Sequence, residues 1–468
     1  MNQARIVPIV LWMVAFTLPA LLGPGCANIV PPGGGPRDSL PPVLLSALPK
    51  DSALEVTTQK ITLNFDEFIE LRNANEKILV APYPQQLPIY ESRLRTLTVR
   101  LKDSLLPNTT YVIDFGNAIV DLNEGNVLRD FRYVFSTGAR IDTNELTGRV
   151  VLAETGRTDS TMFALLYRKE EDSTVAKETP PYVARVDSKG QFRFSNLPEG
   201  RFYVYALLDA DGNKRYNQPI ETFAFADSPV VLPGAAPVRL FAYAEEKDKP
   251  RRPPATKEPD AKRLVFTPSL ESGALDFTDT LLLVYARRLG RVNPDRIRLL
   301  ADSVLTPETF TLRWDTVGNR LLIHRTWKGG SNYKLVLEQD YAADTSGMAA
   351  PRNDTLSFRV RSEKEYGSLR IRFKNLDTSL HPVLLFYNGE QLYRSYPLQG
   401  KELLLPYFRP GSYQLALLFD TNRNGIWDPG AYFIQPRRQP ERVLSLGKSI
   451  NVRENWDNET EIELTADQ

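Results

Sequence analysis

A short stretch near the C-terminus carries oxygen-donor side chains at the spacing with which an EF-type calcium loop begins. The donors stand at loop positions 1, 3, 5 and 9: Asp420, Asn422, Asn424 and Asp428. Gly425 at position 6 permits a sharp turn, but position 12 is Ala431, where an EF-hand requires a bidentate glutamate. We therefore expect either a Ca²⁺ site outside the EF-hand class or a turn held by its own Asp and Asn side chains.

A second stretch carries a reduced version of the same pattern. Its oxygen donors are Asp209, Asp211 and Asn213. Lys214 stands where the first loop has its glycine, so we expect this loop to be the weaker of the two Ca²⁺ candidates. Any affinity would fall in the range of extracellular modules, on the order of 10⁻⁴ to 10⁻³ M. Beyond Ca²⁺ the sequence predicts no cofactor.

The chain has few of the residue types on which most catalytic sites depend. Zinc sites, Cys-His pairs and Ser-His-Asp triads draw on cysteine and histidine, and the chain has only Cys26, His324 and His381. His324 lies in an apolar strand pattern and His381 precedes a proline, so we interpret both as structural. A hydrolase built on paired carboxylates would need a deep pocket, which short sandwich loops do not supply. We therefore predict that the protein is not an enzyme.

The composition indicates a folded, multi-domain protein. A length of 468 residues predicts three or four domains. The content of 42% hydrophobic and 25% charged residues is typical of globular proteins. The 58 basic and 57 acidic side chains leave a net charge of +1, so no nucleic-acid partner is expected. The 35 prolines against 4 methionines favour short strands joined by turns.

The N-terminus has the pattern of an export signal. Residues 6–22 are almost wholly apolar and follow Arg5. The stretch contains two prolines and is barely long enough to span a bilayer, so a removed signal is a better interpretation than a permanent helix. It resembles a bacterial lipoprotein signal, which implies cleavage after residues 1–25 and diacylation of Cys26 as an anchor. The alternative is a chance cysteine in a cleaved leader.

Alternation of apolar and polar residues with period two predicts strands along the rest of the chain, as at Ile61, Leu63 and Phe65. We expect an all-β fold, a tandem array of four β-sandwich modules after the signal peptide. The modules are residues 38–140, 143–245, 263–362 and 366–466. Residues 26–37 are rich in Pro and Gly and predict a tether, and the charged, Pro-rich residues 246–262 predict a linker.

An internal repeat relates the two halves of the chain. Residues 197–209 realign with residues 408–420, which places Gly200 on Gly411 and Asp209 on Asp420. The order of modules is therefore A-B-linker-A-B, and the two oxygen-donor loops occupy equivalent places in the two B modules.

Several segments carry family resemblances. The first A module, with Ile-Thr-Leu-Asn-Phe-Asp-Glu at residues 61–67, resembles a bacterial Ig-like domain, and the second A module resembles it more weakly. The B modules, with Leu-Pro-Glu-Gly-Arg-Phe-Tyr-Val-Tyr at residues 197–205, resemble transthyretin-like or carboxypeptidase-regulatory-like sandwiches. Together with Cys26, the whole chain is similar to Ig-like-domain lipoproteins of Bacteroidota outer membranes.

That resemblance implies an outer-membrane, lipid-anchored location on the periplasmic or the cell-surface face. We expect a non-enzymatic spacer and protein-interaction scaffold, partnered by another envelope protein and acting as an accessory subunit of an outer-membrane complex. The alternative is a carbohydrate-binding surface lipoprotein with a glycan partner, which would present exposed aromatic residues on one face, such as Trp427 with Tyr432.

The lipid anchor gives a first testable prediction. Replacing Cys26 by Ala should abolish incorporation of an alkynyl fatty acid and move the protein out of the membrane fraction, because the chain has no other cysteine to acylate. Metabolic labelling in the native host, followed by fractionation and blotting, measures both. A Cys26→Ala variant that is still labelled and still sediments with membranes would exclude lipidation at this position.

Overall fold

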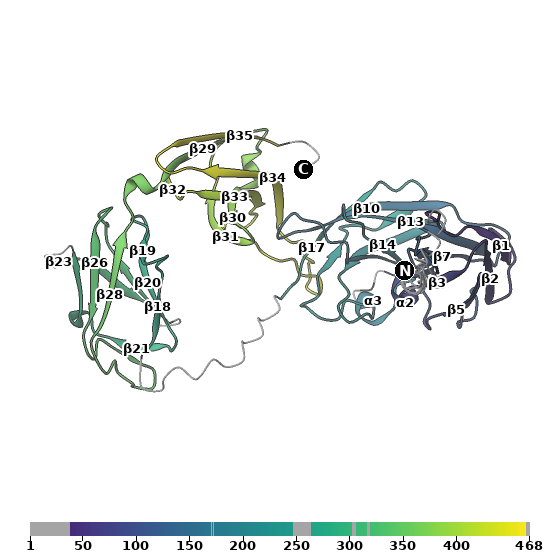
Figure 1. The fold of residues 1–468 in the computed structure, drawn as a ribbon, viewed down its shortest axis with the longest axis horizontal. Coiled ribbons are helices and arrows are strands. Elements are labelled where there is room, and N and C mark those ends of the chain that lie inside the picture. The colour runs from purple at the N-terminus through teal and green to yellow at the C-terminus, as the bar shows by residue number, and fades with distance from the viewer. Residues whose placement is uncertain are drawn as a thin grey trace, which may run out of the picture. The chain divides into compact units, whose positions relative to one another are not determined.

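The computed structural model describes residues 38–169, 171, 173–246, 264–301, 306–315 and 319–464. The predicted signal peptide, Cys26, the tether and all of the predicted linker except Glu246 lie outside these residues. Nearly every described element is a strand, so the all-β prediction is confirmed (Figure 1). No helix within the described ranges has the length and apolarity needed to cross a bilayer.

The described chain forms two compact units. The first comprises the described part of Met1–Val80 with Gln86–Ala139, and the second comprises Ala81–Gln85 with the described part of Arg140–Gln468.

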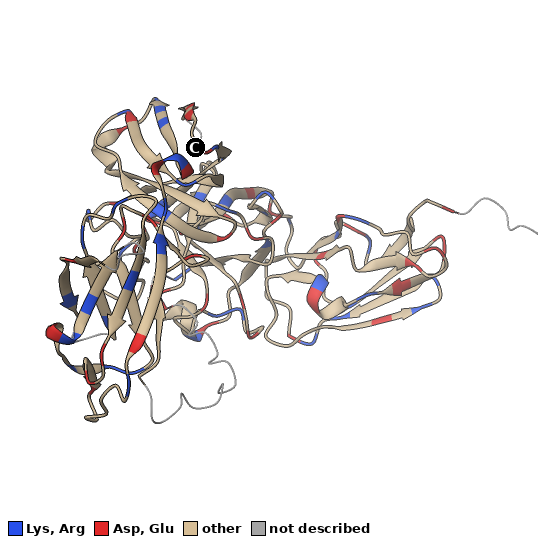
Figure 2. Cartoon of the chain, turned by 60° about the vertical axis from the view of Figure 1, so that its left-hand side comes forward, with Lys and Arg blue, Asp and Glu red and all other residues tan. Residues whose placement is uncertain are grey.

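Basic and acidic residues are interspersed over the strands (Figure 2), which agrees with the nearly balanced composition.

The first unit packs a sheet of order β1-β2-β6-β5 against one of order β4-β7-β9, with a β3-β8 pair beside them. The elements are β1 (Leu44–Leu48), β2 (Lys60–Phe65), β3 (Ile69–Leu71), α2 (Ala74–Lys77), β4 (Leu79–Ala81), β5 (Ile89–Arg93), β6 (Thr96–Arg100), β7 (Thr110–Gly116), β8 (Ile119–Asp121) and β9 (Phe131–Ser136). Ile61, Leu63 and Phe65 are buried at alternate positions of β2, as the period-two pattern predicts. The rings of Tyr111 and Phe135 stack at 5.1 Å within this core.

The second unit begins with the stretch that contains the first oxygen-donor loop. Its elements are β10 (Asn144–Leu152), β11 (Phe163–Tyr167), α3 (Thr174–Lys177), β12 (Tyr182–Arg185), β13 (Gln191–Leu197), β14 (Gly200–Leu207), β15 (Phe223–Phe225), β16 (Val230–Leu232) and β17 (Val238–Ala242). One sheet has the order β13-β10-β17, with β10 and β17 parallel, and the other has the order β12-β11-β14-β15, with β16 also paired to β14.

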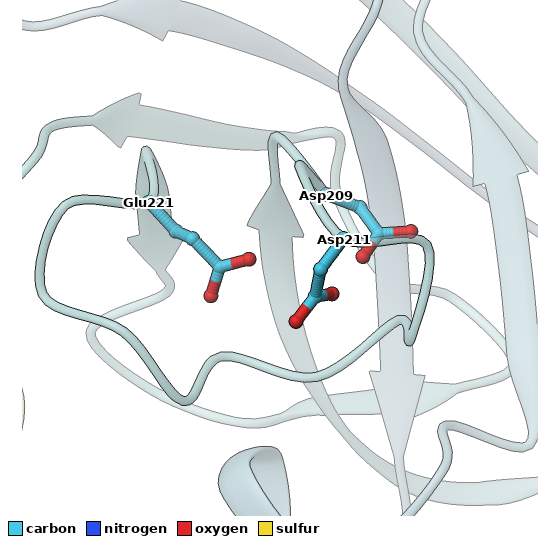
Figure 3. A group of neighbouring side chains, drawn as sticks. All are labelled: Asp209, Asp211 and Glu221. Carbon is cyan, nitrogen blue, oxygen red and sulfur yellow. The ribbon is translucent and has the colours of Figure 1, made fainter.

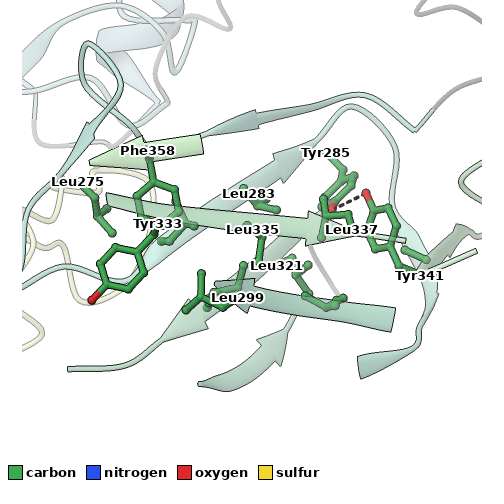
Figure 4. Packing of buried hydrophobic residues seen from close by; sticks show 14 of the residues in the cluster. Leu275, Leu283, Tyr285, Leu299, Leu321, Tyr333, Leu335, Leu337, Tyr341 and Phe358 are labelled. Atoms are coloured by element: carbon green, nitrogen blue, oxygen red, sulfur yellow. Dashed lines mark hydrogen bonds between the residues drawn. The ribbon is translucent and has the colours of Figure 1, made fainter. Parts of the chain in front are cut away.

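The next stretch has a core of its own. Its elements are β18 (Phe266–Pro268), β19 (Ala274–Leu275), β20 (Leu281–Tyr285), β21 (Leu289–Val292), η1 (Pro294–Arg296), β22 (Ile297–Ala301), β23 (Thr306–Glu308), β24 (Thr311–Trp314), β25 (Arg320–His324), β26 (Asn332–Leu337), β27 (Ala342–Asp344) and β28 (Asp354–Val360). Sheets of order β18-β20-β25-β24 and β19-β28-β26-β22-β23 enclose the core. The hydroxyls of Tyr285 and Tyr341 are hydrogen-bonded there at 2.9 Å (Figure 4), so two buried polar atoms satisfy each other.

The last stretch repeats the plan of the second module. Its elements are η2 (Glu363–Glu365), β29 (Gly367–Lys374), η3 (Thr378–Leu380), β30 (Pro382–Asn388), β31 (Gln391–Pro397), β32 (Glu402–Phe408), β33 (Gly411–Phe419), β34 (Arg442–Val452) and β35 (Asp457–Glu463). The parallel β29–β35 pair matches the parallel β10–β17 pair. Gly200 and Gly411, which the sequence aligns, open β14 and β33 with φ of 124° and 152°. Both conformations favour glycine.

A separate hydrophobic cluster is buried in each of the four stretches, within residues 56–135, 146–242, 264–360 and 369–462. The four predicted ranges therefore each enclose a core, while their boundaries stay predictions.

Close backbone packing gives a prediction for the β10 sheet. A Cβ added at Gly148 would overlap the Phe192 ring and the Val238 carbonyl oxygen, so β10 and β17 have no room for a side chain there. Gly148→Ala should lower the free energy of unfolding by about 1–3 kcal/mol, because the two strands must separate to admit the methyl group. The midpoint of denaturant unfolding should fall accordingly. Gly400→Ala is the matched control, since a Cβ there meets nothing within 4 Å. Equal unfolding midpoints for the two variants would contradict the close β10–β17 packing.

Candidate functional site

The loop between β33 and β34 holds its acidic side chains with its own donors. Asp420 is buried, and its oxygens accept hydrogen bonds from the backbone N–H groups of Asn424 at 3.2 Å and Gly425 at 2.7 Å. The side-chain amides of Asn422 and Asn424 both donate to Asp428 Oδ2 at 2.6 Å. The donor set expected for Ca²⁺ is thus brought together, but in the arrangement of a side-chain-stabilised turn.

Glu441 closes the same loop from its far end. Its carboxylate is buried and accepts hydrogen bonds from Thr421 N at 2.7 Å, Thr421 Oγ1 at 2.8 Å and Asp428 N at 3.1 Å. Trp427 Nε1 donates to the Glu441 carbonyl at 2.7 Å. Both carboxylate oxygens of Glu441 have partners, so the loop satisfies its buried charge without an ion, and Ca²⁺ binding here stays a prediction.

The loop between β14 and β15 is arranged differently. Asp209 accepts hydrogen bonds from Lys214, from the backbone N–H at 3.0 Å and from Nζ at 2.5 Å. Asn213 Nδ2 donates to Asp211 Oδ2 at 2.6 Å, and the side-chain oxygen Oδ1 of Asn213 accepts from Arg215 N at 2.6 Å. Asn213, predicted as a ligand, therefore has its oxygen engaged by the backbone.

Glu221 is the residue of this loop that the sequence reasoning missed. Its carboxylate points toward Asp209 and Asp211 (Figure 3), and the three side chains can bring one oxygen each within 4.8 Å of the others. Glu221 is 2% exposed. Oε2 accepts from Asn217 N and Gln218 N at 3.3 Å each, while Oε1 is buried without a hydrogen-bond partner. Burial raises the pKa of Glu221, and the charges of Asp211 and Asp209 raise it further.

One signal could have found Glu221. Glu221 and Glu441 each come just before the strand that pairs with β14 or β33, the strands that Asp209 and Asp420 follow. The two loops differ in length, so a search for fixed spacing after the aspartate cannot align the two glutamates, whereas the strand order can.

The β33–β34 loop also reaches into another module, and we call residues 420–441 the clasp loop. Tyr432 of this loop is fully buried. Its ring packs edge-on against Tyr205, Phe223 and Phe225, with centroids 5.9, 5.2 and 5.3 Å away. The hydroxyls of Tyr432 and Tyr205 lie 3.2 Å apart, and Tyr432 N donates to Glu245 Oε1 at 3.0 Å. The module of residues 143–245 therefore receives an aromatic side chain from the last module.

Further contacts extend this joint. Phe433 stacks on Tyr216 with centroids 5.6 Å apart. Gln439 Nε2 donates to the Phe225 carbonyl at 3.0 Å and to Asp227 Oδ1 at 2.7 Å. The backbone of β34 also contributes a hydrogen bond, which Val443 N donates to the Ala153 carbonyl at 2.8 Å. The joint combines apolar burial with direct backbone pairing, as stable interfaces do.

A polar joint connects the last two modules. Asp276, which is 3% exposed, accepts hydrogen bonds from the Tyr366 hydroxyl at 2.5 Å and from Arg409 Nε at 2.6 Å. Arg394 Nη2 lies 2.7 and 2.8 Å from the two carboxylate oxygens of Asp279. Charge-assisted bonds of this kind fix geometry closely when they are buried.

The segment that crosses this joint is itself held by Glu365. Arg359 donates to both oxygens of Glu365, at 2.5 and 2.9 Å, and Ser362 N donates at 2.9 Å. The Arg359 guanidinium, together with Ser362, lowers the pKa of Glu365 to about 2.

The pair of Trp427 and Tyr432, given as an example of an aromatic platform for glycan binding, does not form an exposed pair. The sequence predicts that Trp427 and Tyr432 are exposed together, but Tyr432 is fully buried in the joint, because its ring is covered by the aromatic side chains of the other module. Trp427 lines a cavity of about 470 Å³ with Tyr387 and Glu390.

The two histidines lie apart from these loops in the sequence and have ordinary local surroundings. His324 is the last residue of β25, and its Nδ1 lies 3.1 Å from Thr280 Oγ1. His381 takes a left-handed turn conformation.

Comparison with known proteins identifies one domain. Residues 38–137 match the family model of the bacterial Ig-like domain. These residues form a bacterial Ig-like domain. The expectation for the first module is thereby confirmed, while the match does not extend to the rest of the chain. No curated protein matches the chain in sequence.

Solved structures add only remote likenesses. The Bacillus anthracis TIE protein is 12% identical, covers 93% of this chain and 76% of its own, and has a TM-score of 0.17. BcpA, the major pilin subunit of Bacillus cereus, is 8% identical, covers 69% and 99%, and has a TM-score of 0.16. The N-terminal part of the bacterial S-layer protein SbsC is 15% identical, covers 42% and 44%, and has a TM-score of 0.16. Scores this low support no inference about arrangement or function.

The Glu365 contacts predict a pH dependence. Because the folded pKa of about 2 lies below the ordinary value of 4.5, the ionised carboxylate stabilises the fold above pH 4.5, and this contribution is lost as the pH falls toward 2. At neutral pH, Glu365→Gln should lower the free energy of unfolding by about 1 kcal/mol, seen as unfolding at a lower denaturant concentration. The difference in stability between the variant and the unaltered protein should shrink below pH 4.5. The exposed Glu454→Gln serves as control. A pH-independent difference for Glu365→Gln would contradict the ion pair.

Proposed function

We propose that this chain is a non-enzymatic, lipid-anchored protein of the cell envelope that acts as a spacer and protein-interaction scaffold. One observation carries the proposal, which is the insertion of Tyr432 from the clasp loop into the module of residues 143–245. Location at the outer membrane and an envelope-protein partner belong to the same proposal, supported by the export-signal pattern before Cys26 and by the Ig-like domain at residues 38–137.

A scaffold has to hold its modules in fixed relation, and the clasp loop does so between modules that are not neighbours in sequence. The intervening module is itself bonded to the last one through Asp276 and Asp279. The sequence of residues 246–262, which precede it, is charged and Pro-rich and does not predict a fixed arrangement of the modules. Side-chain and backbone contacts at both joints supply that restraint instead, so the second unit can act as one stiff body.

The geometry supports binding over catalysis. Glu221 and Asp276, two buried carboxylates whose pKa is raised by burial, lie in a turn and in a module joint. The glycan-binding alternative loses the aromatic pair on which it depended, because Tyr432 faces the other module and not solvent.

The stiffness of the second unit can be measured by pulsed electron paramagnetic resonance. Spin labels on cysteines at the exposed positions Arg201 and Ser449, in a chain with Cys26→Ser, report the distance between the two B modules. A narrow distance distribution is expected. Tyr432→Ala should broaden it, because removing a buried aromatic ring costs about 3–5 kcal/mol at the joint.

Tyr432→Phe is the matched control, since it keeps the ring and loses only the hydroxyl contact with Tyr205. It should keep the narrow distribution. Circular dichroism establishes that each variant is folded before its distances are compared. A distribution that is equally broad in the unaltered chain and in Tyr432→Ala would contradict the rigid scaffold.

A further inference from the structure

The β14–β15 loop concentrates negative charge where the chain itself compensates only part of it. Asp209, Asp211 and Glu221 can bring one carboxylate oxygen each within 4.8 Å of the others (Figure 3). Among the described residues, the ion pair given for this group is that of Lys214 with Asp209 Oδ2. Three carboxylates against one ammonium leave two negative charges when all are ionised.

Glu221 supplies an independent observation that points to a ligand. The residue is only 2% exposed, and Oε1 has no hydrogen-bond partner. A buried carboxylate oxygen without a partner is unfavourable, and such groups are normally paired, hydrogen-bonded or bound to a metal. The carboxylate is directed toward the two aspartates (Figure 3), so an ion between the three groups would meet the Glu221 carboxylate.

The equivalent loop of the last module shows what a self-sufficient arrangement looks like. There Glu441 has partners on both oxygens, from Thr421 and from Asp428 N. Within the described ranges, the group of acidic side chains that meets the geometric requirement for a metal is the one at Glu221 and not the one at Glu441. Two loops of similar composition therefore hold their glutamates in different hydrogen-bonding arrangements.

We propose that Asp209, Asp211 and Glu221 form a binding site for a hard divalent cation, and that the ion is Ca²⁺. The ligands are all oxygens, as Ca²⁺ and Mg²⁺ prefer, and they stand on an irregular loop. Ca²⁺ accepts such flexible geometry, whereas Mg²⁺ requires a near-ideal octahedron and loses its water reluctantly. Lys214 Nζ also lies over the Phe163 ring, at 4.3 Å from the centroid, so it keeps one partner when the ion takes Asp209.

The site has a structural consequence at the module joint, and this part rests on the proposed scaffold function. The same loop carries Tyr216, whose ring stacks on Phe223 at 4.0 Å and on Phe433 of the clasp loop at 5.6 Å. An ion that ties Asp209 to Glu221 closes the loop on either side of Tyr216. Ca²⁺ would therefore stiffen the surface on which the clasp loop packs.

Isothermal titration calorimetry tests the site directly. The full chain without its signal peptide, stripped with EDTA, is titrated with CaCl₂ and, separately, with MgCl₂. We expect one Ca²⁺ per chain with a dissociation constant on the order of 10⁻⁴ to 10⁻³ M, and weaker binding of Mg²⁺. Thermal unfolding with about 10 mM CaCl₂, well above that range, should show a raised melting temperature.

The variants move the affinity in opposite directions. Glu221→Gln and Asp211→Asn should each weaken Ca²⁺ binding by about tenfold or more, and Asp211 is exposed, so its replacement does not endanger folding. Lys214→Met should tighten binding, because it removes the competing ammonium. Asp428→Asn in the other loop is the matched control and should leave binding unchanged.

Three results would overturn the proposal: no heat and no thermal shift with about 10 mM CaCl₂, binding of Mg²⁺ in preference to Ca²⁺, or loss of binding in Asp428→Asn with retention in Glu221→Gln. The outcome is separable from that of the scaffold proposal. Calorimetry reports the ion whether or not the modules are stiffly joined, and the spin-label distances, recorded in EDTA, report the joint whether or not an ion binds.

Discussion

Two sheets of the second unit carry apolar side chains on both faces. Each sheet must therefore pack against other parts of the protein on both sides. In β14, Tyr205 and Leu207 on one face are buried as deeply as Phe202 and Val204 on the other. The sheet that contains β33 likewise buries Leu418 on the face opposite its main core, in a cluster with Val443. A two-layer sandwich covers one face of each sheet only. The second cover must come from outside the sandwich, and the clasp loop provides it for β14.

The sequence contained part of this information. Strict alternation at Ile61, Leu63 and Phe65 correctly predicts a strand with one buried face. Residues 202–207 are apolar without alternation, which is typical of a strand covered on both sides. That pattern indicates a second cover but not its identity. Tyr432 lies 227 residues beyond Tyr205, and no local pattern links the two, so the sequence predicts Tyr432 at the surface when it is in fact buried.

The two oxygen-donor loops show the same limit at the level of a site. Residue types and spacing correctly located both loops at the ends of equivalent strands, β14 and β33. They favoured the loop at Asp420, whose carboxylates the structure shows bonded to the loop's own backbone and amides. What separates the loops is the hydrogen bonding of Glu221 and Glu441. Hydrogen bonding depends on loop conformation, and in loops of unequal length the sequence alone does not determine it.

The position of Tyr432 in the chain also bears on how the protein is made. Synthesis proceeds from the N-terminus, so the strands of residues 143–245 are made well before the segment that carries Tyr432. Before Tyr432 is in place, Tyr205 and Phe225 lack its ring as a packing partner. The aromatic packing of an earlier module is thus completed by a segment near the end of the polypeptide, so a chain that ends before Tyr432 would lack these contacts.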